Sequence, residues 1–146
     1  MTTMHFQLSS WAPDQTAALE AWGHDRRAVM QAGLDATLAL MVGEDAQQGG
    51  GEGLMVPLRG EGATVAALFS DLLDDLFEQI AVHGPMQSAT IDGVLTRDRE
   101  GFVAWGYLSP RAHTTPAVAF EQAGAVEAVV ETPDEIRLRV TLHRMG

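Results

Sequence analysis

The 146-residue sequence contains no cysteine, no lysine and no asparagine, and all nine of its basic residues are arginines. The absence of cysteine excludes disulfide bonds, thiol nucleophiles, iron–sulfur clusters and cysteine-ligated zinc. The arginines stand against 20 aspartates and glutamates, which gives a formal net charge of −11. Binding to nucleic-acid phosphates needs a basic surface. We therefore expect no direct nucleic-acid binding, whereas a basic protein partner is compatible with this charge.

Long apolar runs and the common catalytic motifs are also missing. No apolar run approaches the ~20 residues of a transmembrane helix, and the first ten residues do not resemble a signal peptide, so we expect no membrane association and a cytoplasmic location. The sequence has no GxSxG, P-loop, HExxH or helix-opening GxGxxG motif. We predict that the chain is not an enzyme. A small hydrolase using His143 and Asp14 is a weaker alternative, because no nucleophile can be identified.

What the chain does contain is typical of a folded protein. Hydrophobic residues make up 46% and charged residues 20% of the sequence, which is ordinary for a globular domain. The length predicts one domain that spans residues 1–146. The one biased segment is the glycine-rich stretch Gly43–Gly53, which we interpret as a loop that divides no domain.

Two segments show the 3.6-residue periodicity of amphipathic helices. The first spans about Asp25–Val42, with Asp25 as its N-cap. The second spans about Thr64–Val82 and has the clearer pattern, because apolar residues line one face and carboxylates the other. It should end at His83-Gly84-Pro85, since glycine suits the position after a helix and proline cannot continue it. Its apolar face comprises Val65, Leu68, Phe69, Leu72, Leu73, Leu76, Phe77 and Ile80.

The remaining segments predict β-strands and hence an α+β fold. Residues 136–143 alternate between aliphatic and polar side chains, the pattern of a strand that is buried on one face. Residues 102–108 are rich in aromatic and β-branched side chains, and we expect a hairpin with residues 89–96. Further strands are expected at residues 5–8, 17–22, 55–58, 118–121 and 126–131.

The apolar faces of these elements must be buried against one another. We therefore expect an antiparallel or mixed sheet with the two main helices packed on it. In this arrangement Leu72, Leu76 and Phe77 of the second helix are buried against Leu138 and Val140 of the last strand.

Three groups of side chains are candidates for chemistry. The five histidines are scattered singly, which disfavours a histidine metal cluster. Four carboxylates line the polar side of the second helix, namely Asp71, Asp74, Asp75 and Glu78. A solvated acidic face is the common outcome of this pattern, and a cation site or a patch for a basic partner is the alternative.

Four aromatic residues are candidates for a stacking surface, namely Trp11, Trp22, Trp105 and Tyr107. Trp22 and Trp105 lie in predicted strands, which favours a partly buried position.

Four segments, in this order along the chain, carry a family resemblance. They are Leu19-Glu20-Ala21-Trp22-Gly23 before a helix, Leu68–Phe77, Gly106–His113 and the closing strand Ile136–His143. The first resembles a strand that ends in a small–aromatic–Gly turn, and the second a Leu-Leu-x-Asp-Trp-Leu-Asn-Glu-Leu helix. The third is similar to Gly-Glu-x-x-x-Pro-x-x-His, one residue shorter. Together they resemble the archease family, small proteins that activate the RNA-splicing ligase in tRNA splicing and RNA repair. The resemblance spans nearly the whole chain and implies an archease-like single domain.

The sequence departs from the family at the metal site that the resemblance implies. In the family, the first hairpin carries His-Thr-Ala-Asp, whose Asp is a metal ligand, and here Thr16 stands in its place. The terminal strand of the family ends in a second ligand Asp, where this chain has His143. The family's Lys-Ala-x-Thr-Tyr-His motif falls near residues 117–122, which contain neither lysine nor histidine. Asp14 would replace the lost ligand if the hairpin is shifted. Asp14 and His143 are therefore the candidate metal ligands.

The cation that the resemblance implies is a divalent one such as Ca²⁺, which prefers several oxygen ligands including carboxylates. Thr16 and His143 remove two negative charges and add a nitrogen ligand that suits Zn²⁺ better. The site is thus expected to be degenerate. The resemblance implies a non-catalytic accessory protein with an RNA ligase as protein partner. The alternative is a divergent protein-binding module on the same fold.

Overall fold

The structure, a computed structural model, describes residues 5–9, 12–13, 16–42, 55–84, 86–97, 101–110 and 120–144. Asp14, Trp11 and the glycine-rich stretch Gly43–Gly53 lie outside these residues. Within the described part, the order of elements is β1 (Phe6–Leu8), β2 (Thr16–Gly23), α1 (Arg26–Val42), β3 (Val56–Gly62), α2 (Val65–His83), β4 (Met86–Arg97), β5 (Gly101–Pro110), β6 (Phe120–Glu131) and β7 (Ile136–Arg144).

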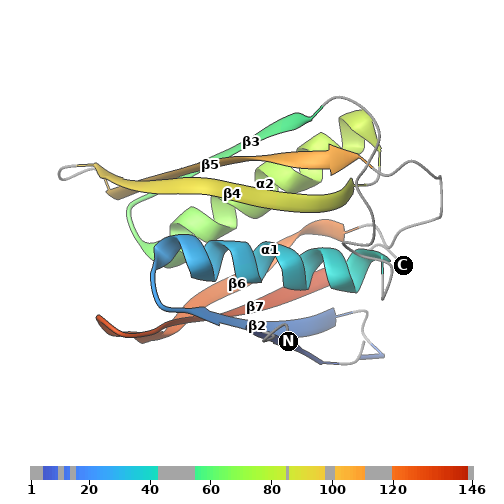
Figure 1. Cartoon of the computed structure of the whole chain (residues 1–146). Helices are drawn as coiled ribbons and strands as arrows, with labels where there is room; N and C mark the ends of the chain where they lie inside the picture. Colours follow the sequence, from blue (N-terminus) through green and yellow to red (C-terminus); the bar gives the residue numbers. More distant parts are fainter. Residues whose placement is uncertain are drawn as a thin grey trace, which may run out of the picture.

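The strands form two antiparallel sheets (Figure 1). One sheet has four strands in the order β1-β2-β7-β6, and the other has three in the order β3-β5-β4. The predicted α+β class with two main helices is confirmed. The strands divide into two sheets rather than one. The three-stranded sheet ends at β3 and β4 because a helix, and not a further strand, lies along each of them.

The two helices lie between the sheets (Figure 1). Helix α1 packs on β2 and β4, and α2 packs chiefly on β3 and β6. Both inner sheet faces and both helices contribute to one hydrophobic core. Leu72 and Leu76 are fully buried in this core together with Leu138 and Val140, as predicted, whereas Phe77 is only partly buried. The main strand neighbours of α2 are nevertheless β3 and β6 rather than β7.

Both helices begin and end within one residue of the predicted positions. Asp25 caps α1, because its Oδ1 accepts a hydrogen bond of 2.8 Å from the Ala28 N–H. Thr64 caps α2 in the same way through Oγ1 and the Ala67 N–H, at 3.1 Å. Gly84 follows α2 with a φ of 91°, which glycine adopts without a Cβ penalty. Within the described residues, no helix is both long and apolar enough to cross a membrane.

The strands differ more from prediction than the helices do. The predicted hairpin of β4 and β5 is confirmed by their antiparallel pairing. Strand β6 runs continuously over Phe120–Glu131, where the sequence suggested two short strands. Its pairing with β7 contains three register shifts, and each such irregularity interrupts the alternation from which a strand is predicted.

Candidate functional site

The two positions at which the resemblance implies metal ligands lie side by side. Thr16 opens β2, and its partner in the β2–β7 ladder is His143, near the end of β7. This confirms the expected proximity of the first hairpin to the terminal strand. The position of Asp14, the other proposed ligand, lies outside the described residues, so its proximity to His143 stays a prediction.

The described side chains at this position do not fit a hard divalent cation. His143 is exposed and Thr16 is half-buried, and together they offer one imidazole and one hydroxyl. The adjacent pair on the same sheet face is Ala18 with Thr141, which adds no carboxylate. Among the described residues, no group of three or more histidines or carboxylates is arranged to hold a metal ion. Ca²⁺ needs several oxygen ligands with negative charge, so Thr16 and His143 alone do not form a calcium site.

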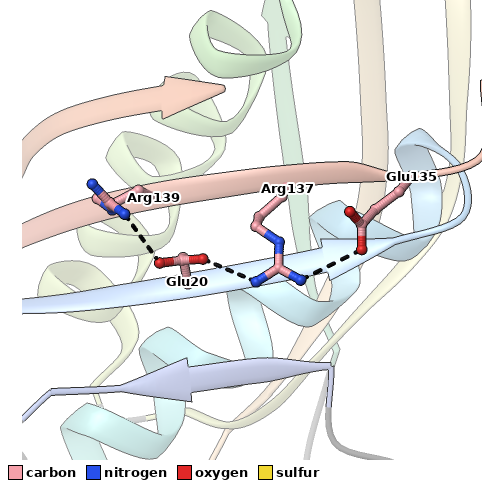
Figure 2. Close-up of polar contacts among 4 residues, drawn as sticks. All are labelled: Glu20, Glu135, Arg137 and Arg139. Carbon is pink, nitrogen blue, oxygen red and sulfur yellow. Dashed lines mark hydrogen bonds and ion pairs between the residues drawn. The ribbon is translucent and has the colours of Figure 1, made fainter. Parts of the chain in front are cut away.

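Further along the same sheet face, an ion-pair network joins β2 to β7 (Figure 2). Glu20 accepts one hydrogen bond from Arg137, at 3.0 Å, and another from Arg139, at 3.3 Å. Arg137 also contacts Glu135 at 3.4 Å, and its guanidinium lies 4.5 Å from the centre of the Trp22 ring. Both carboxylate oxygens of Glu20 are thus occupied by arginines.

The network fixes the charge state of Glu20. The hydrogen bond from Arg137, supported by that from Arg139, lowers the pKa of the Glu20 carboxyl. The hydrogen bond to Glu20 in turn raises the pKa of Arg137. A carboxylate that two guanidiniums hold in its charged form is a weak base and a poor ligand for a further cation. Glu20 therefore stabilises the pairing of two strands and is not available to the metal position.

The acidic face of α2 has a structural role that the sequence did not reveal. Asp71 Oδ2 accepts a hydrogen bond from the Glu61 N–H at 2.8 Å, and Asp75 Oδ2 accepts one from the Arg59 N–H at 2.9 Å. The two aspartates are four residues apart on the helix, a rise of about 6.0 Å, and the two N–H groups are two residues apart on the strand, a rise of about 6.6 Å. The carboxylates are therefore spaced like the N–H groups that they bind. The carboxylates take the place of a neighbouring strand along the free edge of β3.

The close approach of α2 to β3 depends on a glycine. A Cβ atom on Gly60, between the two capped residues, would lie 2.8 Å from Leu72 Cγ, so a larger residue would push the strand away from the helix. Asp74 and Glu78 stay exposed on the outer side of α2 and line a surface pocket with Arg59 and Glu61. On the acidic face, Asp71 and Asp75 thus cap the edge of β3, whereas Asp74 and Glu78 are exposed to solvent.

The other edge of this sheet, β4, is capped by α1. The side-chain amide of Gln31 donates to the Ala89 carbonyl and accepts from the Ile91 N–H, both at 2.8 Å. Gln31 also donates to Asp35 Oδ1 at 3.0 Å. Asp35 is half-buried, and this burial raises the pKa of its carboxyl to about 6. Neither residue carries a sequence signal for this role, because the contact joins residues 58 or more positions apart.

Replacing Asp35 by asparagine is expected to stabilise the protein at pH 7.5. The folded state holds the Asp35 proton more tightly than the unfolded state, so stability falls as pH rises from about 4 to about 6 and stays reduced above that. Asp35→Asn keeps the acceptor oxygen for Gln31 and removes the buried charge. We expect a gain of about 1 kcal/mol at pH 7.5, less than the full shift would give because solvent reaches part of the carboxyl, and almost none at pH 4.

Urea unfolding at both pH values measures this difference. Asp74→Asn, on an exposed carboxylate of α2, is the matched control and should show no comparable gain. A loss of stability in Asp35→Asn at pH 7.5 would show that the charged carboxylate is needed by Gln31.

The four aromatic candidates do not form one surface. Trp22 is half-buried on the four-stranded sheet, as predicted, and Trp105 is 38% exposed on the three-stranded sheet. Trp105 is thus also only partly buried, but it lies on the outer face of its sheet, away from the core. Tyr107 lies two residues further along the same strand, so only these two share a described surface.

Comparisons with known proteins identify the fold and no function. No family model and no curated protein matches the chain. The solution structure of Methanobacterium thermoautotrophicum protein 1598 is similar with a TM-score of 0.70, at 16% identity, over 97% of this chain and 99% of that one. At this identity, the likeness shows that the two chains share a fold over nearly their whole length.

Proposed function

We propose that the chain is an archease-like accessory protein that assists an RNA-splicing ligase in tRNA splicing or RNA repair and is not itself an enzyme. The observation that carries the proposal is the pairing of Thr16 with His143 across β2 and β7. These are the two positions that, by resemblance, hold the metal ligands of the archease family. Residues from opposite ends of the sequence thus meet where that family would need them.

The other segments of the resemblance support the same proposal. Leu19–Gly23 ends β2 directly before α1, and Leu68–Phe77 lies within α2. Ile136–His143 forms β7, and Gly106–Pro110 ends β5. The described parts of the four segments thus lie in successive elements in the same order along the chain as in the resemblance.

Action through a protein contact fits the charge and the polar groups of the chain. A net charge of −11 opposes binding to RNA phosphates. Asp71, Asp75 and Gln31 hold the edges of a sheet, and Glu20 is occupied by arginines. With the family's carboxylates replaced at Thr16 and His143, the proposed activity is weaker than that of an archease with both.

An RNA-joining assay tests the proposal. A purified RNA-splicing ligase from the same host is given two RNA pieces, and joined RNA per ligase molecule is measured with and without the chain. We expect more joined RNA with the chain present, and less than with an archease that carries both Asp residues. A gel shift with the RNA alone is the control and should show no binding by the chain. Absence of any effect on the ligase would contradict the proposal.

The alternative is a divergent protein-binding module on the same fold with an unrelated partner. The loss of both carboxylates at the position of Thr16 and His143 is the observation that favours it. The two candidates differ in the joining assay, because the alternative has no effect on the ligase at any concentration.

A further inference from the structure

The outer face of the three-stranded sheet carries two aromatic side chains on its central strand. Trp105 and Tyr107 lie two residues apart on β5, so their side chains share a face. The core residues Ala104 and Leu108 alternate with them and face the helices. In register with Tyr107 are Pro57 of β3 and Thr90 of β4. We call Pro57, Thr90, Gly93, Trp105 and Tyr107 the Trp105 face.

The Trp105 ring lies across the neighbouring strand. Gly93 of β4 is its partner in the ladder, and a Cβ atom on Gly93 would lie 2.8 Å from Cζ2 and 3.0 Å from Cη2 of the ring. Only a residue without a side chain leaves this space to the indole. The ring therefore packs against the β4 backbone while 38% of the residue stays exposed, which makes it a flat apolar surface next to a tyrosine and a proline.

Both aromatic side chains retain hydrogen-bond donors. Among the described residues, neither the Trp105 indole N–H nor the Tyr107 hydroxyl is hydrogen-bonded to another group of the protein. Trp and Tyr side chains usually find such a partner when they take part in an interface. The Trp105 face thus offers an apolar platform together with two donors for carbonyl oxygens.

The charged residues around the Trp105 face indicate which kind of ligand can bind there. Arg59 is the β3 partner of Trp105, and Arg97 lies further along β4. Both arginines are neutralised by Glu61, at 3.3 and 3.2 Å. The exposed Asp92 next to Gly93 adds a second negative charge. The surroundings are therefore balanced, without the excess of positive charge that a nucleic-acid strand needs. A second copy of the chain would also carry a net charge of −11, which opposes self-association. An uncharged ligand fits best.

We propose that the Trp105 face docks a proline-rich segment of a partner protein in the polyproline II conformation. Such a segment is uncharged, presents proline rings that pack on flat aromatic side chains, and leaves its carbonyl oxygens free to accept hydrogen bonds. Trp105 and Tyr107 supply both the flat surface and the donors. The proposal is independent of the RNA-ligase function, because it concerns a different sheet from that of Thr16 and His143.

Nuclear magnetic resonance titration of the full chain with a capped peptide of nine prolines tests the proposal. The indole N–H signal of Trp105, assigned from its loss in Trp105→Ala, should shift with a dissociation constant on the order of 0.1–1 mM, as for a small transient contact. A glycine–serine peptide of equal length should not shift it. Trp105→Ala should weaken binding, followed on the Tyr107 backbone signal, at least tenfold. Trp105→Phe, which keeps a ring and loses the donor, should give an intermediate loss.

Val129→Ala is the matched control, because Val129 is an apolar residue of similar exposure, 43%, on the other sheet. It should bind the proline peptide like the unaltered chain. Three results would overturn the proposal: no shift of the Trp105 signal at several millimolar peptide, a shift with oligouridine instead of the proline peptide, or a dimer in solution that buries Trp105. Each is measured without a ligase, so failure here leaves the RNA-joining result unaffected.

Discussion

Replacement of Leu72 by alanine is expected to lower the free energy of unfolding by about 2–5 kcal/mol, the usual cost of a large-to-small change in a core. Leu72 is fully buried, and its side chain fills the space beside Gly60, where α2 packs closely on β3. The helix is also held to that strand by Asp71 and Asp75. Surrounding atoms are therefore poorly placed to collapse into the cavity. Chemical unfolding, followed by circular dichroism, measures the loss.

Val82→Ala is the matched control for this change. Val82 lies on the same helix but is 71% exposed, so its replacement should change stability by no more than about 0.5 kcal/mol. Equal midpoints for the two variants would show that α2 is not packed between the sheets in solution.

Conversion of Thr16 and His143 together to aspartate is expected to give Ca²⁺ binding that is much tighter than that of the natural chain. The two residues are direct partners across β2 and β7, so the change would bring two carboxylates to the position that the archease resemblance assigns to the metal. We expect a dissociation constant on the order of 10–100 µM for the double variant. The natural chain should bind at least tenfold more weakly. Isothermal titration calorimetry measures both.

The control adds the same charge to the adjacent pair on the same face. Ala18→Asp with Thr141→Asp places two carboxylates opposite each other two pairs further along the ladder, and it should not produce comparable binding. If the natural chain itself binds Ca²⁺ in the micromolar range and Asp14→Ala abolishes this, Asp14 is a ligand and the site is intact rather than degenerate.

The helices could be predicted from the sequence because their signals are local. Thr64 and Gly84 mark the ends of α2 within the segment itself, and its apolar residues repeat at helical spacing. No local feature of the sequence indicates that the strands divide into two sheets. It depends on Asp71 and Asp75 meeting β3, and on Gln31 meeting β4 at a separation of 58 or more residues.

The candidate site was predicted in part for a similar reason. The proximity of Thr16 to His143 came from the archease resemblance, since no spacing rule brings residues from opposite ends of a chain together. The pairing of Glu20 with Arg137, 117 residues away, could not be read from alternation alone because it requires the register of β2 and β7. The sequence did not indicate that Trp105 lies on the outer face of its sheet, because alternation defines two faces of a strand and does not say which one is covered.

The capped edges restrict how a partner can bind. An open sheet edge is a common place for a partner to add a strand. At β3 and β4 the outward backbone groups of Arg59, Glu61, Ala89 and Ile91 are already bonded to helix side chains. A partner is therefore expected to contact the sheet faces or the exposed helix surface instead of these edges.

Direct binding to a purified RNA-splicing ligase is the measurement that tests the proposed function most closely. Titration calorimetry of the natural chain into the ligase, without RNA and with a metal chelator present, separates a protein contact from effects of RNA or cation. We expect a complex with a dissociation constant in the micromolar range or tighter, with little dependence on the chelator. Absence of binding at about 100 µM ligase, with both proteins folded, would contradict the accessory role.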